Sequence, residues 1–236
     1  MAEQEISKHT KKAFKIWSSN EHSWQHKLQE FFIEIAIIVF AVSVSIWFHN
    51  RSEHAHQQAD VKTFLTDLKE DIGVDTANMH RSINAINKEL PNINFLLQLT
   101  PQIIDSITKK PNSSLGFSSG ISTTKINNGN YEGFKSSGKI GNIEDKKLKK
   151  LILKYYQEIT PDVLEVEKYN HAWVAKIDDF AAEYSSTDIL RIFLDKKFKY
   201  MLNKYIDSSN QNVKTYNEAI HIAEEILTEI NKELKN

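Results

Sequence analysis

Histidines on both sides of an apolar segment are the residues whose spacing best fits metal chemistry. His22 and His26 precede the segment, and His49, Glu53 and His56 follow it. Imidazole and carboxylate groups three or four residues apart share one helical face, as zinc ligands often do. The order His-Glu-x-x-His is absent, and such side chains beside a membrane more often face water. We therefore expect no metal site, and proton sensing by these imidazoles is no better supported.

One carboxyl group, Glu34, lies within the apolar run from Phe31 to Phe48. An intramembrane carboxyl indicates function by default, because its desolvation must be offset by a partner. Glu34 is also close enough to the start of the run to reach headgroup water or Lys27. Ser43 and Ser45 lie deeper, and their hydroxyls can hydrogen-bond to a second membrane helix. Glu34, Ser43 and Ser45 are therefore candidate interaction residues.

No enzyme motif stands out in the chain. Gly138 and Gly141 are isolated and form no phosphate-binding loop, and Ser136 and Ser137 have no histidine nearby. Cysteine is absent, which excludes thiol catalysis and thiolate zinc sites. We expect no catalytic residue and no cofactor. The 30 basic residues balance 31 acidic ones, so we also expect no nucleic-acid partner.

The run from Phe31 to Phe48 predicts a transmembrane helix. Its eighteen residues include only three polar ones, and a helix of that length covers roughly 27 Å, close to the thickness of the bilayer core. A buried helix of a soluble domain usually has a polar face, and about thirty residues precede the run, unlike a signal peptide. We predict a tail at residues 1–20 and a helical segment at residues 21–58 that contains the span.

Positive charge is more frequent before the span than after it. The basic residues within twenty positions are Lys11, Lys12, Lys15 and Lys27 on one side, and Arg51 and Lys62 on the other. The positive-inside rule then places the N terminus in the cytoplasm and the remainder outside the inner membrane. Membrane lipids are accordingly expected as partners.

Apolar residues after the span recur in alternating steps of three and four. One stripe runs from Val61 to Leu97, with a slip near Gly73, and a second runs from Val213 to Leu234. This spacing predicts two long helices that pack through their stripes, as in a coiled coil. Further helices are predicted at residues 143–159, with Asn142 as cap, and at 161–184 and 187–206. Residues 59–236 are thus predicted to form an extracytoplasmic antiparallel helical bundle, which makes the whole chain all-α.

Residues 109–142 form a predicted long loop, because they contain six of the seven glycines and many Ser, Thr and Asn residues. Within this loop, Asn130 is expected to cap a short helix that Gly138 ends in a left-handed conformation. Tyr131 and Phe134 would share one face of this helix and attach the loop to the bundle. They complete the candidate interaction residues.

Two stretches of the chain resemble a known family. A Glu-Ile pair opens the span, and Tyr-Glu-x-x-Lys-Ser-Ser-Gly precedes a helix with paired tyrosines; the matching residues are Glu34, Ile35, Asn50, Glu53, Tyr131, Glu132, Lys135, Ser136, Ser137, Gly138, Tyr155 and Tyr156. The chain is similar here to a bacterial family of small, single-span, helix-rich membrane proteins of unknown function. It departs from that pattern at Ile33 and Ala41, where glycine is usual, and at Arg51, where tryptophan is usual. The resemblance implies a topology and no activity.

Two functions remain open. The first is a non-enzymatic interaction protein, a subunit or scaffold of an envelope membrane complex, whose partners are other membrane or envelope proteins or a second copy. The alternative is a single-span sensor whose extracytoplasmic bundle binds a small ligand or responds to pH. A cytoplasmic part of about thirty residues is short for an output domain, which favours the first.

The predicted orientation can be tested with reporter fusions. A reporter that is active only outside the cytoplasm should be active when fused after Asn236 and inactive when fused before Met1, because the lysines before the span keep that end inside. A reporter that works only in the cytoplasm should give the reverse. Activity of the first reporter at the N terminus alone would contradict the orientation.

Overall fold

The computed structural model describes residue 11 and residues 24–109, 124–184 and 189–235, which form helices and short connections without any strand. The prediction of an all-α protein is confirmed for these residues. The chain divides into two compact units between Asp60 and Val61, and helix α2 (Trp24–Leu97) contributes to both. The predicted tail lies outside the described residues except for Lys11.

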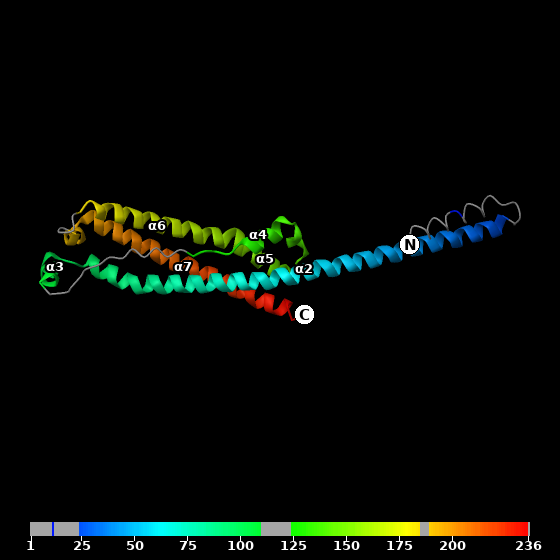
Figure 1. The fold of residues 1–236 in the computed structure, drawn as a ribbon, viewed down its shortest axis with the longest axis horizontal. Coiled ribbons are helices and arrows are strands. Elements are labelled where there is room, and N and C mark those ends of the chain that lie inside the picture. The colour runs from blue at the N-terminus through cyan, green and yellow to red at the C-terminus, as the bar shows by residue number, and fades with distance from the viewer. Residues whose placement is uncertain (1–10, 12–23, 110–123, 185–188, 236) are drawn as a thin grey trace. The chain divides into compact units, whose positions relative to one another are not determined.

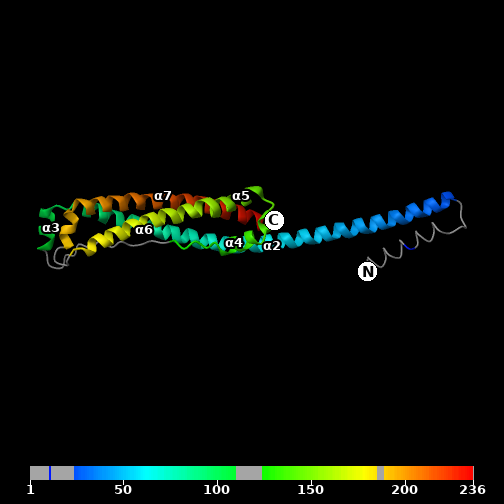
Figure 2. The same ribbon diagram turned by 90° about the horizontal axis from the view of Figure 1, so that it is seen from above.

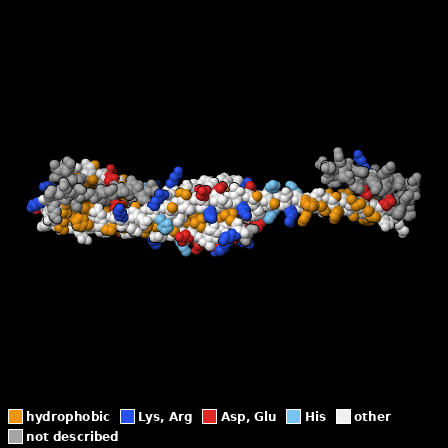
Figure 3. Space-filling view, turned by 60° about the horizontal axis from the view of Figure 1, so that its bottom comes forward, with side chains coloured by type: hydrophobic (Ala, Val, Ile, Leu, Met, Phe, Trp, Pro, Cys, Tyr) orange, Lys and Arg blue, Asp and Glu red, His pale blue; other side chains and the backbone are white. Residues whose placement is uncertain are grey.

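The first unit contains the apolar part of α2. From Leu28 onward this helix is long and apolar enough to cross a membrane, with a mean hydropathy of 2.4 over an eighteen-residue window of which only 6% is buried. Phe32, Phe40 and Trp47 all point mainly to the outside, and Figure 3 shows apolar side chains gathered along this helix. Such a surface is compatible with the predicted membrane span, because water solvates it poorly.

The second unit contains the rest of α2 and the helices that follow it. These are α3 (Pro101–Thr108), α4 (Gly129–Ser136), the 3₁₀-helix η1 (Lys139–Asn142), α5 (Lys146–Lys154), the π-helix η2 (Tyr155–Ile159), α6 (Thr160–Ala182), the 3₁₀-helix η3 (Ile189–Leu194) and α7 (Lys196–Glu233). Within this unit α2, α6 and α7 lie side by side in both views (Figures 1 and 2). The unit is therefore a packed set of helices.

Two helix starts differ from the sequence prediction. Asp145, and not Asn142, caps α5: its Oδ1 accepts hydrogen bonds from the backbone N–H groups of Lys147 (2.8 Å) and Leu148 (3.0 Å). A carboxylate is favoured there because it satisfies two N–H groups that lack a partner within the helix. The predicted break before Pro161 is also wrong, since α5, η2 and α6 follow one another directly. Pro161 comes directly after the π-helix η2, where the regular α-helical hydrogen-bond pattern is already interrupted.

Helix α7 combines two helices that the sequence predicts separately. It begins after Asp195, whose Oδ1 accepts hydrogen bonds from the backbone N–H groups of Lys197 (2.7 Å) and Phe198 (3.0 Å), and it runs to Glu233. The predicted end at Ile206 is wrong, because polar residues between Ile206 and Val213 continue the helix instead of ending it.

Buried apolar side chains form two clusters in the second unit. One cluster joins α2, α4, α5, η2 and α7, and the other joins the ends of α2 and α6 to the start of α7. The predicted first stripe faces these clusters, with the buried positions Val61, Leu65, Leu68, Ile72, Met79, Ile86 and Ile93. In the second stripe Tyr216, Ala223 and Ile230 are fully buried, whereas Leu227 is only partly buried beside fully buried Ile226.

The packing of α7 predicts that alanine substitutions at two adjacent residues lower the free energy of unfolding by different amounts. Ile226→Ala should lower the free energy of unfolding by about 2 to 5 kcal/mol, because it removes a fully buried side chain and leaves a cavity. Leu227→Ala should cost clearly less, because this side chain is only partly buried. Denaturant unfolding of the full chain in detergent, followed by circular dichroism, measures both. Equal effects would contradict this orientation of α7.

Candidate functional site

A buried carboxyl group, Asp75 on α2, holds the segment that leads into α4. Its Oδ1 accepts hydrogen bonds from the backbone N–H (3.0 Å) and the Nδ2 (2.9 Å) of Asn127, and its Oδ2 lies 3.2 Å from the same backbone nitrogen. Four residues earlier on α2, Oδ2 of Asp71 accepts a hydrogen bond from Nδ2 of Asn130 at 2.8 Å. Asn130 therefore contacts α2, and the prediction that it caps the short helix is wrong; the N-cap is Asn128.

The environment of Asp75 changes its acidity. Burial raises the pKa of Asp75 to about 6; the backbone hydrogen bond from Asn127 opposes this change and the nearby carboxyl of Asp71 adds to it. Burial also raises the pKa of the neighbouring Tyr155 and Tyr156 above the usual range, and the charge of Asp75 adds to that effect. The Tyr155 hydroxyl is buried without a hydrogen-bond partner in the described part of the chain. Asp75 thus changes its charge in a mildly acidic range.

Aromatic rings attach α4 to the rest of the second unit. The fully buried ring of Tyr131 stacks on Tyr156 with centroids 4.3 Å apart, and its hydroxyl accepts a hydrogen bond from Nε2 of Gln157 at 2.9 Å. Phe134 stacks on Phe64 with centroids 4.0 Å apart. The expected attachment of this helix through its two rings is confirmed, as is the left-handed Gly138 (φ 75°) after it. Tyr131 itself faces the core and not a free surface.

A belt of buried polar side chains lies between the two apolar clusters. This polar belt consists of Glu167 and Asn170 on α6 and Ser208, Ser209, Asn212 and Thr215 on α7. On α7 the belt follows Tyr205 of one cluster and precedes Tyr216 of the other. Nδ2 of Asn170 donates hydrogen bonds to the hydroxyl oxygens of Ser208 (2.8 Å) and Ser209 (3.0 Å), which links the two helices.

Glu167 is the charged member of the polar belt. Its Oε1 accepts hydrogen bonds from the backbone N–H of Thr124 (2.9 Å), from the Thr124 hydroxyl and from the Tyr216 hydroxyl (2.6 Å). Burial, followed by the bond to Glu167, raises the pKa of Tyr216 above the usual range, so its hydroxyl stays a donor. Donors from the chain itself thus surround this carboxylate oxygen, which is suited to holding the fold.

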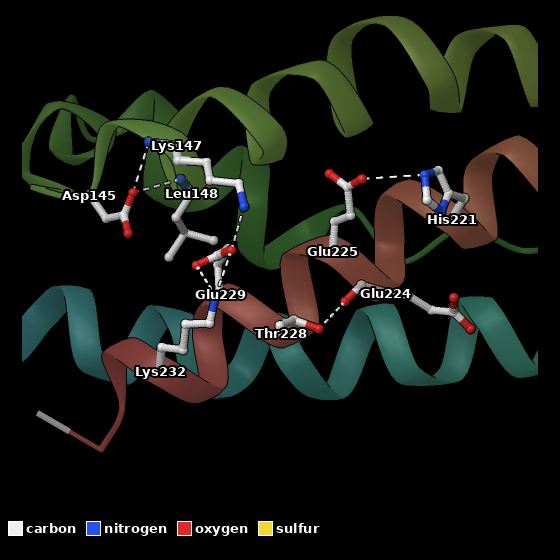
Figure 4. Close-up of polar contacts among 9 residues, drawn as sticks. All are labelled: Asp145, Lys147, Leu148, His221, Glu224, Glu225, Thr228, Glu229 and Lys232. Atoms are coloured by element: carbon white, nitrogen blue, oxygen red, sulfur yellow. Dashed lines mark hydrogen bonds and ion pairs between the residues drawn. The ribbon is translucent and has the colours of Figure 1, made fainter.

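An ion-pair cluster joins α5 to the last turns of α7. Nζ of Lys147 lies 2.6 Å from Oε1 of Glu229, and Nζ of Lys232 lies 3.0 Å from the same oxygen (Figure 4). The hydrogen bond from Lys147, and then that from Lys232, lowers the pKa of Glu229 below its ordinary value. Because both lysines are exposed, water screens this cluster, and it orients α5 more than it stabilises the unit.

The candidate residues of the span lie on different sides of α2. Glu34 is buried, with 4% of its surface exposed, although the helix around it is open. Ser45 is eleven residues further on and shares that face, whereas Ser43 lies on the opposite side, because each residue turns an α-helix by about 100°. Both serines are exposed, and the Ser45 hydroxyl donates a hydrogen bond to the Ala41 carbonyl at 2.8 Å.

The histidines form no metal site in the described residues. His22 lies outside them, as does the side chain of His26. Across the ranges that the structure describes, no three His, Cys, Asp or Glu side chains gather closely enough to hold a metal. Instead of joining His49 and His56 in a site, Glu53 accepts a hydrogen bond from Nε2 of Gln57 at 3.0 Å.

Two of the buried polar residues occupy positions in the apolar stripes of the sequence. Asp75 occupies the stripe position between Ile72 and Met79, where the sequence suggests a slip near Gly73. Ser209 likewise lies at a stripe position, four residues before Val213. A polar residue at such a position of an unbroken helix indicates a buried polar contact rather than a helix end.

The pKa of Asp75 predicts a pH-dependent stability. Because it lies above the ordinary 3.8, the folded protein binds this proton more tightly than the unfolded chain does. The contribution of Asp75 to stability is therefore greatest below about pH 4 and is lost as the pH rises through about 6. Asp75→Asn should reduce the difference in unfolding free energy between about pH 5 and pH 7 by about 1 to 2 kcal/mol.

Denaturant unfolding at several pH values measures this difference. Asp67→Asn is the matched control, since Asp67 is an exposed carboxyl on the same helix and should leave the pH dependence unchanged. If Asp75→Asn keeps the pH dependence of the unchanged protein, Asp75 does not titrate in this range.

Comparison of the chain with models of protein families, with curated proteins and with solved structures gives no match. Its function therefore has to be inferred from its own residues and contacts.

Proposed function

We propose that the protein is a non-enzymatic, membrane-anchored helical interaction protein that serves as a subunit or scaffold of an envelope membrane complex. The observation that supports this most is the apolar surface of α2, of which 6% is buried in its most apolar window. Lipid or other membrane helices must cover such a surface, because water solvates it poorly. Anchoring to a membrane is thus part of the proposed function.

In this proposal the span crosses a bacterial inner membrane, with the N terminus in the cytoplasm and the second unit in the periplasm. The excess of lysine before the span supports the orientation, and the family resemblance supports a bacterial origin. The second unit is proposed to be an antiparallel bundle. Hydrogen bonds between α7 and α2 support this. Lys199 donates to the carbonyl of Leu97, whereas Tyr205, further along α7, donates to Glu89, which comes earlier on α2, so the two helices run in opposite directions.

The buried carboxyl groups support an architectural role for the second unit. Asp75 and Glu167 accept hydrogen bonds from Asn127, Thr124 and Tyr216, all of the same chain. A general base needs a free lone pair directed at a substrate, and these contacts direct the carboxylates at the backbone and side chains instead. The role that fits them best is to position the segment before α4.

Partners are expected to contact the span and the exposed parts of the second unit. Glu34 and Ser45 share one face of the span, and a carboxyl in a membrane usually faces protein rather than lipid. Ser43 offers a second contact on the opposite side. Phe134 is only partly buried, so part of its ring remains open to a partner. The proposed partners are lipids and other membrane or envelope proteins, including a second copy.

A second candidate function is a single-span sensor that responds to pH. It is favoured by the hydrogen bonds that Asp75 accepts from Asn127, because their strength depends on the charge of Asp75. The groups that face Asp75 are Asp71 on α2 and Tyr155 and Tyr156 on η2, and none of them brings a compensating positive charge. A sensor of this kind would lose its pH response in the Asp75→Asn variant, whereas an architectural subunit would keep its partners.

Cross-linking from the span tests the proposed function. The chain has no cysteine, so Ser45→Cys creates a single thiol on the face of Glu34, to which a photoreactive reagent can be attached in isolated membranes. We expect discrete protein adducts from this site, which mass spectrometry identifies. Ser43→Cys probes the proposed second contact on the opposite face and should give adducts of its own. If neither site cross-links to any protein, the chain does not work in a membrane complex.

A further inference from the structure

Lysine is concentrated in one stretch of the second unit. Residues 129–154, which form α4, η1 and α5, contain seven lysines and only three acidic residues. The whole chain, in contrast, has a net charge of -1. The described residues 173–184 and 189–199 around the end of α6 and the start of α7 contain five basic and four acidic residues. Positive charge is therefore gathered around α4 and α5.

Two lysines of α5 share the side that faces away from the core. Lys146 and Lys150 are four residues apart and exposed, whereas Leu148 and Ile152 are fully buried. Because each residue turns an α-helix by about 100°, the exposed pair points away from the buried pair. The outer face of α5 thus presents two positive charges to the surroundings.

Two further lysines lie on either side of the turn between α4 and η1. Lys135 and Lys139 are both exposed, and Nζ of Lys135 lies 5.4 Å from the centre of the Tyr131 ring. Because Tyr131 is fully buried, its ring limits where this charge can lie. We call the four exposed lysines the basic end, namely Lys135, Lys139, Lys146 and Lys150.

The basic end lies beside the residues of α2 with which the second unit begins. Phe134, next to Lys135, stacks on Phe64, which is three residues after the start of this unit. Lys147 joins α5 to Glu229, four residues before α7 ends. Figures 1 and 2 agree with these contacts, since α4, α5 and the C terminus lie at one end of the second unit and α3 lies at the other.

The chain limits how far this end of the unit can lie from the proposed membrane. Val61, the first residue of the second unit, follows Phe48, the last residue of the predicted span, by thirteen residues of α2, which rise about 20 Å. Lipid headgroups occupy roughly 5 to 8 Å of this distance, and at physiological salt charges attract one another over a further 8 Å or so. An anionic membrane surface is thus a negatively charged partner that the chain itself keeps within reach.

We propose that the basic end docks on anionic phospholipid headgroups of the membrane that holds the span. The ammonium groups of its lysines lie against lipid phosphates, as those of other basic clusters beside a membrane span do. Lysine suits this contact because its mobile point charge can meet many headgroups and needs no fixed bidentate partner. The proposal rests on the membrane anchoring in the proposed function. Docking would fix which side of the second unit faces the lipid.

Quenching of a fluorescent label by lipid in reconstituted vesicles tests this proposal. The full chain has no native cysteine, so Ser136→Cys places one label beside Lys135, and Ser106→Cys places one on α3 at the other end of the unit. In vesicles that contain phosphatidylglycerol and a lipid with a nitroxide on its headgroup, we expect quenching at Ser136→Cys and little at Ser106→Cys. About 1 M salt should abolish the quenching, because it shortens the Debye length to about 3 Å. Phosphatidylcholine in place of phosphatidylglycerol should abolish it as well.

Glutamine in place of the four lysines of the basic end removes their charge. This variant should lower the ratio of docked to undocked copies at least about tenfold, because each lysine near an anionic surface adds to the binding. The matched control removes four exposed charges elsewhere in the second unit, with glutamine at Lys88, Lys168, Lys196 and Lys214. It should leave the quenching unchanged. Circular dichroism shows whether both variants remain helical.

Loss of quenching in the basic-end variant but not in the control supports the proposal. Four results overturn it: no quenching in anionic vesicles, equal quenching in neutral ones, equal quenching at Ser106→Cys, or equal loss in the control. The adducts of Ser45→Cys form within the membrane and do not depend on these lysines. Adducts without quenching would therefore leave the proposed function standing and the docking proposal wrong.

Discussion

The buried carboxylate of Glu167 is the contact on which the arrangement of the second unit depends. Glu167 lies on α6, and its Oε1 accepts hydrogen bonds from Thr124 in the segment before α4 and from Tyr216 on α7. A buried carboxylate that loses its donors is strongly destabilising, whereas the same group with its donors in place is tolerated. A shift of α7 by one residue would turn Tyr216 away from Glu167, so this contact allows one register of the helices.

Asp75 on α2 is a second buried acid that accepts hydrogen bonds from the segment before α4. Glu167 holds Thr124 and Asp75 holds Asn127, so two buried acids on different helices fix both ends of a four-residue segment. The next residues form α4, whose Tyr131 and Phe134 stack on rings from η2 and α2. Polar contacts therefore decide where the aromatic rings pack. Tyr155 and Tyr156 lie close enough to Asp75 for its charge to raise their pKa values.

The internal use of these polar groups limits the surfaces that the proposed partners could contact. Glu167, Asn170, Ser208, Ser209 and Asp75 already have partners in the chain, and Tyr131 is fully buried. Among the described residues, the apolar face of the span remains open. In the proposed membrane complex, anchoring in one membrane would keep copies and partners close together, which raises their effective concentration. A weak contact at the span would then be enough for the proposed assembly.

Local sequence determined the helical class, the candidate span, the left-handed stop at Gly138 and most of the first stripe, because each depends on neighbouring residues or on a short period. The starts of α5 and α7 are local as well, since Asp145 and Asp195 each cap N–H groups two and three residues ahead. Only the tertiary structure decided the continuity of α7 and the burial of Asp75 and Glu167. Glu167 meets its partners 43 and 49 residues away, and Asp75 meets Asn127 at a separation of 52. A polar side chain at a stripe position has the pattern of a helix end until such a distant partner is known, because burial of a polar group is tolerated only when that partner is in place.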